Sequence, residues 1–315
     1  MTKTHWTTQA ARTAVLLAAG LVLAALAARD ARAAFEYLEV DPRARAMGGA
    51  FTAMDGGALA LFHNPASLAL TEQTSVGATY VQPQGLDFVK LAAVGAVTRL
   101  PGAAGGLGIA FRRLATDYND VTLDAENQFS LAHGFRVYHD VSTSVALGYA
   151  LNVYNLKFGP TGTGDDPGSA STVGLDVGLR VTLRDRAAFG FLVQNLNNPT
   201  IGDVEKEDLP RRLVGGVAYS PYAGVTTTLD MESSLGQKVR FRGGTEFSVT
   251  DYGFLRFGVA TDPNLFSAGL GLAWRGIRFD YGFSTGAGPL KDSHQVGLTI
   301  TPALLRGGSP AEGKE

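Results

Sequence analysis

Long stretches of the chain alternate between large apolar residues and small or polar ones. In residues 172–183, TVGLDVGLRVTL, every second position is valine or leucine, and the positions between hold threonine, glycine, aspartate and arginine. The pattern recurs in 265–274 and 277–284. A period of two is that of a β-strand, in which successive side chains point to opposite faces. The sequence therefore predicts strands with one large apolar face and one small or charged face.

About fourteen segments have this character, and together they predict an all-β fold. They cover roughly residues 73–82, 87–98, 105–114, 126–138, 141–156, 170–183, 186–195, 210–219, 224–232, 238–249, 253–261, 265–274, 277–284 and 291–300. A soluble sandwich would turn the apolar faces inward, whereas a membrane barrel turns them toward lipid. Strands near ten residues and charges of both signs on the polar faces favour a transmembrane antiparallel β-barrel of about 14 strands across residues 73–300.

The gaps between the segments support a barrel. Short even-numbered connections occur at 139–140, 184–185, 220–223 and 275–276, and the longest even one is 99–104. Long connections occur among the odd ones, at 115–125, 157–169 and 196–209. Membrane barrels alternate short periplasmic turns with longer outer loops. The parity predicts that the barrel chain begins and ends in the periplasm, with residues 301–315 as a periplasmic tail.

The first 33 residues have the features of a secretory signal peptide. A basic start precedes an apolar run at 14–28, and an A-x-A cleavage site ends at Ala33. The run is shorter than the 20 or so residues of a transmembrane helix. We expect cleavage after Ala33 and localisation to the cell outer membrane. Because the chain has no cysteine, it has neither disulfides nor a lipid-anchoring cysteine.

Residues 34–72 precede the first strand and differ from everything after it. They are rich in glycine and alanine and carry little charge after Arg45. We expect a short helix capped by Asp55 that ends by Asn64, because the residue before a proline avoids the helical region. Asn64 can then cap a second turn that starts with Pro65. A compact, weakly charged segment of this kind fits inside a barrel mouth, and we call it the hatch.

The hatch carries a resemblance to a known family. It resembles the opening motif of the PorV/PorQ-like proteins, which belong to the broader FadL-like outer-membrane family of long-chain fatty-acid transporters. The matching residues are Gly48, Gly49 and Ala50, the small residues 58–60, and the corner Asn64, Pro65 and Ala66. Further matches lie at 189–199, 209–221 and 277–300. The resemblance implies a fourteen-stranded barrel, although the chain departs from the family by continuing past its final strand.

The resemblance implies two alternative functions. One branch of the family transports small hydrophobic molecules across the outer membrane past its hatch, and the PorV branch serves exported proteins in type IX-like secretion. A hydrophobic path could use apolar side chains of the hatch, or these could simply fix the hatch to the wall. They are Phe35, Tyr37, Phe51, Leu59, Leu61 and Phe62. The outer loops lack the aromatic anchors of a tight interface, Tyr118 excepted, which slightly favours transport over docking.

The polar strand faces predict a filled interior rather than an ion-selective channel. They carry Lys90, Arg112, Arg136, Arg180, Arg240, Arg242, Arg256 and Arg278 together with Asp176, Asp230, Glu232, Glu246 and Asp280. A selective channel would carry a ring of one sign, whereas a mixed set pairs internally. The net charge of −2 argues against nucleic acid as a partner. A membrane barrel has outer-membrane lipid as its partner, and the sequence leaves the oligomeric state open, with a monomer plausible.

Patterns for catalysis, metals and cofactors are weak. Ser293 adjoins His294, but neighbours on a strand point to opposite faces and cannot act as nucleophile and base. No two of the five histidines have the spacing of a zinc pair on one helix. The acidic stretch 116–126 lacks the glycine of an EF-hand and is interpreted as a solvated outer loop, with a weak cation site bridging lipid phosphates as the alternative. We therefore expect no enzyme activity, no metal and no cofactor.

Overall fold

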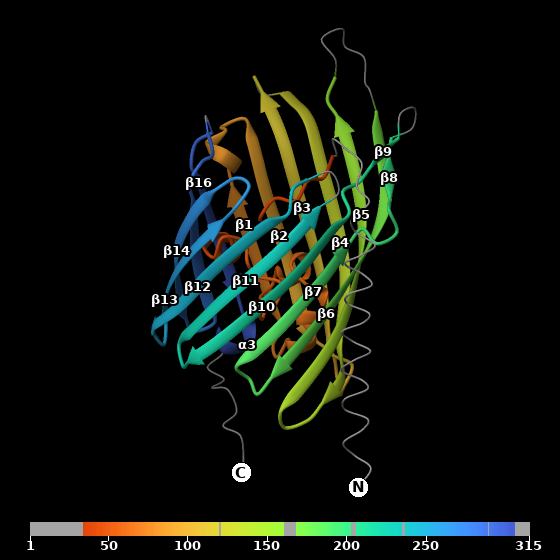
Figure 1. The fold of residues 1–315 in the computed structure, drawn as a ribbon. Coiled ribbons are helices and arrows are strands. Elements are labelled where there is room, and N and C mark those ends of the chain that lie inside the picture. Colours follow the sequence, from red (N-terminus) through yellow and green to blue (C-terminus); the bar gives the residue numbers. More distant parts are fainter. Residues whose placement is uncertain are drawn as a thin grey trace.

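The computed structural model describes residues 34–119, 121–160, 168–202, 206–234, 237–288 and 290–305. Fourteen strands form one closed antiparallel barrel (Figure 1). They are β1 (Ser75–Val81), β2 (Val89–Arg99), β3 (Gly106–Tyr118), β4 (Val121–His139), β5 (Thr143–Phe158), β6 (Ser169–Leu183), β7 (Ala187–Gln194), β10 (Arg212–Tyr222), β11 (Val225–Ser234), β12 (Arg240–Thr250), β13 (Gly253–Ala260), β14 (Leu265–Trp274), β15 (Ile277–Ser284) and β16 (Ser293–Ile300). The predicted all-β barrel is confirmed, and each predicted segment overlaps one strand.

The strands follow one another around the barrel in chain order. The ring closes where β1 pairs with β16, from Val76 opposite Ile300 to Val81 opposite Gln295. A small separate hairpin, β8 (Thr200–Ile201) and β9 (Glu207–Asp208), lies in the connection between β7 and β10. Closure leaves none of the fourteen strands with an unpaired edge, which is the condition for a sheet to cross lipid.

The two ends of the barrel differ in their connections. One end, which we call the loop end, carries the connections 82–88, with the short helix η3 (Pro83–Gly85), 159–168, 195–211 and 285–292. The other, the turn end, carries the connections 100–105, 140–142, 184–186, 223–224, 251–252 and 275–276. β1 begins and β16 ends at the turn end, at the bottom of Figure 1. The loop end also carries the short connections 119–120, 235–239 and 261–264. The predicted parity therefore holds only in that the longest connections all lie at the loop end.

The predicted loop at 115–125 is wrong, because this stretch is mostly strand. β3 continues to Tyr118 and β4 begins at Val121, so a tight turn joins them. Asp117 lies opposite Thr122, whose hydroxyl donates to the Asp117 carboxylate at 2.8 Å. Asn119 has a φ of 49°, the left-handed conformation that tight hairpin turns use. The acidic composition thus belongs to a polar extension of two long strands.

The outer face of the wall is apolar along rows that cross the strands. Val94, Phe111, Phe129, Val153 and Val173 are successive cross-strand partners from β2 to β6. Phe129 is 55% exposed on this face, whereas Asp176, on the inner face of β6, is 5% exposed. Apolar residues outside and polar residues inside are the arrangement of a transmembrane barrel.

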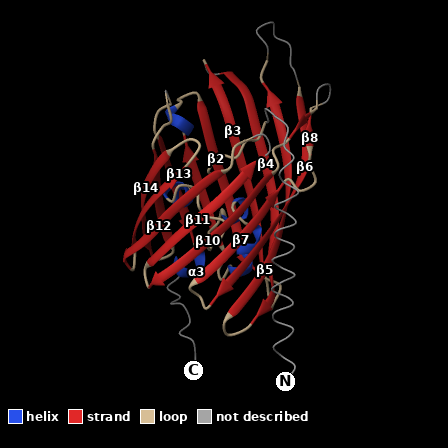
Figure 2. Ribbon diagram, viewed as in Figure 1, coloured by secondary structure: helices blue, strands red, loops and turns tan. Residues whose placement is uncertain are grey.

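The hatch lies inside the barrel. Its helical turns are α2 (Pro42–Ala46), η1 (Ala60–Phe62) and η2 (Pro65–Leu70), drawn in blue among the red strands in Figure 2. α2 packs against β13 to β16, and η2 packs against β2 to β6. The hatch therefore bridges the lumen from one side of the wall to the other.

The predicted caps of the hatch have different outcomes. Asn64 caps η2 as expected: Pro65 takes the first position, and the Ala66 amide donates to Asn64 Oδ1 at 3.0 Å. Asp55 caps no helix, because η1 begins only after Leu59 and has no side-chain cap. The glycines at 56 and 57 separate Asp55 from that turn, and its exposed carboxylate points toward a hatch arginine instead.

A belt of inner-face glycines lies where the hatch touches the wall. Gly134 pairs with Gly148, which pairs with Gly178 on the next strand. A Cβ at Gly148 would lie 2.3 Å from the amide nitrogen of Ala66, closer than real Cβ contacts. The hatch backbone can therefore pack directly against the strand backbone only because these positions carry no side chain.

The two termini extend beyond the described residues. The predicted signal peptide, residues 1–33, lies outside them, as does residue 306 onward of the predicted tail. The described part of the tail contains the short helix α3 (Pro302–Leu305), which follows β16 directly. Within the described ranges, every helix is too short or too polar to cross a membrane.

Candidate functional site: the hatch and its anchors

The hatch runs through the lumen from the loop end to the turn end. Near its start, Phe35 stacks edge-on against Tyr154 of β5 and packs with Ile201 and Leu209 of the 195–211 connection. Further along, residues 55–57 and 70–73 line a cavity at the turn end. Anything that moves along the barrel axis therefore has to pass the hatch.

Asn64 ties the hatch to itself and to the wall. Its side-chain amide donates to the Thr52 carbonyl oxygen at 2.9 Å and to the Leu179 carbonyl oxygen of β6 at 3.1 Å. The side chain is buried, and a Cβ at Gly178 opposite would lie 2.1 Å from Asn64 Oδ1. The Asn-Pro corner is therefore a fixed contact among two parts of the hatch and strand β6.

Gly48 and Gly49 form a turn pressed against the opposite side of the wall. Both have positive φ, 68° and 82°. A Cβ at Gly48 would lie 2.5 Å from the Val259 carbonyl oxygen of β13. Both the left-handed conformation and the close approach require glycine here. The structure thus gives a physical reason for the Gly-Gly pair at this point of the motif.

The residues after the glycine turn are held by two side chains of β11. Thr228 Oγ1 donates to the Ala50 carbonyl oxygen at 2.9 Å. The Asp230 carboxylate accepts bonds from the amides of Phe51 at 2.9 Å and Thr52 at 3.0 Å. Charge-assisted bonds to a buried carboxylate are stronger than neutral ones, so Asp230 is a strong anchor for this part of the hatch.

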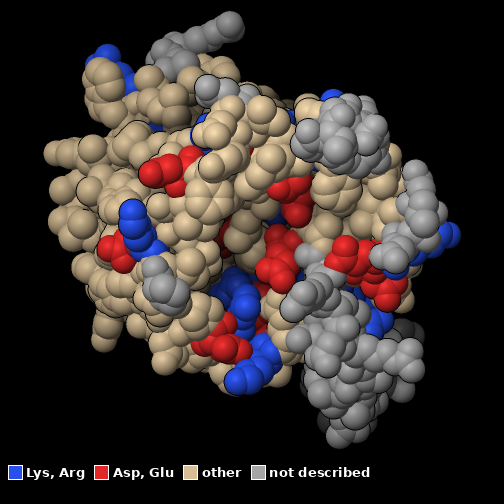
Figure 3. Space-filling model, turned by 90° about the horizontal axis from the view of Figure 1, so that it is seen from above, with Lys and Arg blue, Asp and Glu red and all other residues tan. Residues whose placement is uncertain are grey.

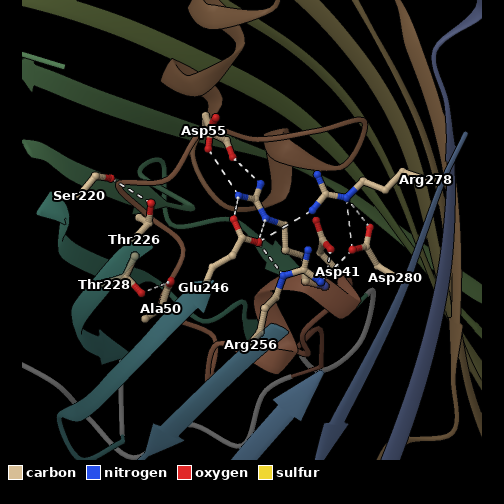
Figure 4. A network of polar contacts seen from close by, with 11 residues as sticks. Asp41, Ala50, Asp55, Ser220, Thr226, Thr228, Glu246, Arg256, Arg278 and Asp280 are labelled. Carbon is tan, nitrogen blue, oxygen red and sulfur yellow. Dashed lines mark hydrogen bonds and ion pairs between the residues drawn. The ribbon is translucent and has the colours of Figure 1, made fainter. Parts of the chain in front are cut away.

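A cluster of ion pairs joins α2 to the wall near the turn end (Figure 4). Arg43 of the hatch makes a bidentate pair with Glu246 of β12, at 2.8 and 2.7 Å. Arg256 of β13 bridges Glu246 at 2.6 Å and Asp280 of β15 at 2.8 Å, and Arg278 pairs with Asp280 at 2.9 Å. Burial alone would lower the pKa of Arg43, but the Glu246 carboxylate raises it above its ordinary value. The hatch guanidinium is therefore held in its charged form.

A second polar cluster surrounds Tyr37 nearer the loop end. Arg212 and Arg242 both pair with Glu232, at 2.8 and 2.9 Å. The Arg212 guanidinium carbon lies 3.6 Å from the centre of the Tyr37 ring, a cation–π contact, and the Tyr37 hydroxyl donates to Glu39 at 3.0 Å. Burial and the Glu39 charge raise the pKa of Tyr37 above its ordinary value. Tyr37 is therefore a neutral phenol that holds two arginines in place.

The six apolar hatch residues named from the sequence occupy separate places. Leu59, Leu61 and Phe62 belong to one buried cluster, in which they pack against inner-face residues of β2, β3, β4 and β5. Phe51 packs in a second cluster, Phe35 in a third, and Tyr37 lies in the polar cluster. The structure thus brings three of the six together.

Cavities beside the hatch are larger at the turn end than at the loop end. One of about 670 Å³ is lined by Asp55 and Gly57 of the hatch and by Arg136 and Arg180 of the wall, among others. Another, of about 430 Å³, lies between the hatch and strands β1 and β14 to β16. Beside Phe35 at the loop end the volume is about 20 Å³. In Figure 3, which looks onto the loop end, charged side chains surround a hollow at the centre.

The charges predicted to face the lumen do so, with one exception. Arg112, Arg180, Arg242, Arg256 and Glu246 are buried inside. Part of the mixed set forms internal ion pairs as expected, among them Arg242 with Glu232 and Arg256 with Glu246, whereas Arg112 and Arg180 form none among the described residues. Lys90 is the exception, because it lies on the outer face and pairs with Asp117 at 3.0 Å. On β2 the inner positions are apolar, such as Leu91 and Ala93, because they pack on the hatch. The rule that polar positions face inward therefore fails on this strand.

Two anchors were missed by sequence reasoning. Arg43 is one, and Arg45 is the other: its guanidinium donates to Gln295 at 2.5 Å, to Ser284 at 3.2 Å and to the Glu39 carbonyl oxygen at 3.0 Å. The sequence does contain a signal for these two anchors, because Arg43 and Arg45 are isolated charges in a segment of small residues. Two cations that enter a barrel interior have to find wall carboxylates or amides there.

The side chains of the serine and histidine weighed for catalysis lie apart in the structure. Ser293 is buried and accepts from the Gln84 amide, whereas His294 is exposed and bonds to Tyr281, so the two point to opposite faces as predicted. Within the same part of the chain, no three histidine, aspartate or glutamate side chains gather as metal ligands.

Comparison with known proteins finds similarity at the level of structure. No family model and no curated protein matches the chain. The chain is similar to the toluene transporter TbuX of Ralstonia pickettii, with a TM-score of 0.57, 15% identity, and coverage of 85% of this chain and 98% of that one. It is also similar to a FadL homologue of Pseudomonas aeruginosa (TM-score 0.56, 12% identity, 85% and 100% covered) and to the toluene transporter TodX of Pseudomonas putida (0.53, 13%, 85% and 98%). At such identities the likeness shows a shared barrel fold.

Proposed function

We propose that this protein lies in the outer membrane, with its loop end outward, and transports small hydrophobic molecules past its hatch. The observation that carries the proposal is a barrel whose lumen is filled by a separately anchored segment with open volume beside it. Two proteins of similar fold are toluene transporters, TbuX and TodX. No ring of one sign lines this lumen, and several of its charges pair with one another, such as Arg212 and Arg242 with Glu232, which favours an apolar solute over an ion.

The path we propose follows the apolar side of the hatch. Leu59, Leu61 and Phe62 meet an apolar inner surface on β2 to β5, and the adjoining residues 56 and 57 border the larger turn-end cavity. A hydrophobic molecule would move along this contact when the hatch loosens. Phe35, at the loop end, and Phe51 would act at earlier points along the route.

The corner Asn64–Pro65 gives the sharpest test of the hatch. Asn64→Ala with Pro65→Ala removes the cap, worth about 0.5–2 kcal/mol, and the bonds to Thr52 and β6. The wall keeps every strand pair. We expect normal assembly, measured by heat-modifiable gel mobility, and several-fold faster uptake of an aromatic hydrocarbon into liposomes. Thr200→Ala, at an exposed position of the loop end, is the control.

The PorV-like alternative, a docking barrel for exported proteins, gives the opposite outcome. In that case the hatch is a permanent seal with no transport role. A double variant that assembles normally and leaves hydrocarbon uptake at the parent rate would contradict the transport proposal and favour docking.

The orientation of the barrel in the membrane can be tested with single introduced cysteines, because the chain has none of its own. A cysteine replacing Lys238 at the loop end should react with an impermeant label on intact cells. One replacing Val141, which is fully exposed at the turn end, should react only after lysis. Labelling of the second alone would invert the proposed topology.

A further inference from the structure

The outer face of β2 to β6 changes character abruptly toward the loop end. One cross-strand row holds Phe111 and Phe129, whose ring centres lie 4.6 Å apart, and is apolar throughout. The next row toward the loop end is polar: Arg113 lies opposite Asn127, which lies opposite Asn155, which lies opposite Ser171. A polar row directly above an aromatic row marks the upper limit of the hydrocarbon region on this wall.

The side chains of the polar row are bonded to one another along the outside of the wall. Arg113 Nη1 donates to Asn127 Oδ1 at 3.0 Å. Asn127 donates to Asn155 at 3.3 Å, and Asn155 donates to Ser171 Oγ at 3.0 Å. The amide and hydroxyl groups fix the direction of the Arg113 guanidinium, which is exposed and forms no ion pair among the described residues.

Two lysines lie in the row above. Lys90 lies opposite Ala115, Ala115 opposite Ala125, and Ala125 opposite Lys157. At about 4.8 Å per strand the two lysine positions are roughly 14 Å apart. Arg113 is on β3, between the strands of the two lysines, and lies one row further from the loop end. Asp117 pairs with Lys90 at 3.0 Å, so the described group contains three cations and one carboxylate. The two alanines between the lysine positions are buried, at 6% and 2% exposed, so neighbouring side chains cover them.

The opposite wall has no such group. Its outer face stays apolar or aromatic toward the loop end, with Phe241, Val259 and Phe266 exposed there. Within the described strands, the Lys and Arg residues of β7 and of β10 to β16 lie at inner-face positions. The outward-facing cations of the loop-end half are therefore gathered on β2, β3 and β5.

We propose that Lys90, Arg113 and Lys157 bind the phosphorylated headgroup of a glycolipid in the outer leaflet. The membrane would supply the anion at this place, because the three side chains point away from the lumen and, in the proposed orientation, lie at the level of the outer-leaflet headgroups. A diphosphorylated disaccharide such as that of lipid A carries two anionic groups on a rigid spacer, which suits two lysines set apart across small residues. The site rests on the proposed orientation and is independent of transport.

The test compares the parent with the triple variant Lys90→Gln, Arg113→Gln, Lys157→Gln. Purified barrels in detergent are titrated with diphosphorylated lipid A and with the same lipid after dephosphorylation, and bound lipid is counted by native mass spectrometry. Each lost cation near a headgroup weakens binding several-fold, so we expect the triple variant to bind at least tenfold more weakly. The control removes three cations from the same end of the other wall: Lys206→Gln, Arg211→Gln, Lys238→Gln.

Three results would overturn the proposal. They are equal weakening in the control, equal binding of the dephosphorylated lipid by the parent, and complete displacement of the lipid by millimolar inorganic phosphate, which would make this a general anion site. Heat-modifiable mobility verifies that both variants assemble. Hydrocarbon uptake into liposomes free of glycolipid should be the same in the triple variant and the parent, so failure of this site leaves the transport proposal standing.

Discussion

The wall and the hatch of this barrel are held by different kinds of interaction. Every wall strand pairs with two neighbours through continuous backbone ladders. The hatch has short helical turns and depends on side-chain contacts at a few points: Glu246 and Asp230 reach it from the wall, and its own Asn64 reaches β6. A ladder of many small bonds tolerates the loss of one, whereas a few buried anchors do not. The difference predicts that single substitutions can free the hatch while the wall stays closed.

The largest effect should come from breaking the hatch anchor at Glu246. Glu246→Gln leaves Arg43 and Arg256 without their shared carboxylate, and removing one partner of a buried pair costs roughly 3–5 kcal/mol. We expect the hatch to become sensitive to protease in liposomes while the wall keeps its heat-modifiable mobility. The double variant Arg43→Met, Glu246→Gln should recover part of the loss. If it recovers none, the two residues are not coupled.

A substitution on the lipid-facing side of the wall should destabilise the barrel itself rather than free the hatch. Arg at Leu270, which is 39% exposed on the outer face of β14, should cost about 2–4 kcal/mol near the bilayer centre. Folding into lipid vesicles, followed by urea titration, measures the loss. Leu270→Met is the matched control, and we expect it to be close to neutral. Equal folding of the Arg and Met variants would contradict a lipid-facing position.

The glycine belt is where the two regions meet, so a substitution there should disturb the hatch without a change of charge. Gly148→Ala places a methyl group 2.3 Å from the Ala66 amide nitrogen, whereas Gly57→Ala meets nothing within 4 Å. Overpacking typically costs 1–3 kcal/mol, so we expect the Gly148 variant to be destabilised and to leak a hydrophobic dye. The Gly57 variant should match the parent in both measurements. If the Gly148 variant also matches the parent in both measurements, the contact between Gly148 and Ala66 relaxes without a measurable cost.

The smallest effect concerns a wall turn that the hatch does not touch. Asp140 accepts from the Tyr138 hydroxyl at 2.6 Å and from the amides of Ser142 and Thr143, and these bonds lower its pKa to about 2. A carboxyl with a depressed pKa stabilises the fold above its ordinary pKa near 3.8, and this contribution is lost as the pH falls toward 2. Asp140→Asn should therefore melt slightly below the parent at pH 7 and converge with it at pH 2. If the difference in melting temperature between the variant and the parent does not change with pH, the charge of Asp140 is not its cause.

The sequence predicts the wall well, because a strand with lipid on one side and a filled lumen on the other has to alternate. The prediction fails where a strand does not have lipid on one side and a polar, filled lumen on the other. The polar extension of β3 and β4 rises beyond the apolar rows, so its acidic residues were interpreted as a loop. Lys90 was placed inside because the inner face of β2 is itself apolar, packed on the hatch.

The hatch is harder to predict, because its contacts are distant in sequence. The cap at Asn64 was found, since Asn-Pro dictates it locally. The bond from Arg43 to Glu246 spans 203 residues, and nothing near either residue reveals the other. The sequence singles out the motif glycines Gly48 and Gly49, but the close approach to β12 and β13 that requires glycine there appears only in the folded barrel.

The seam between β1 and β16 sets the order in which this barrel can be completed. It pairs Val76 with Ile300, residues 224 positions apart (300 − 76), whereas every other strand pairs with its neighbour in the chain. Contacts between distant residues carry the largest loop-closure entropy and form slowest. The hatch and β1 are therefore the first parts of the barrel to be synthesised and the last to be enclosed. Until the seam forms, the hatch stays within reach of the chaperones and proteases that survey unfinished proteins.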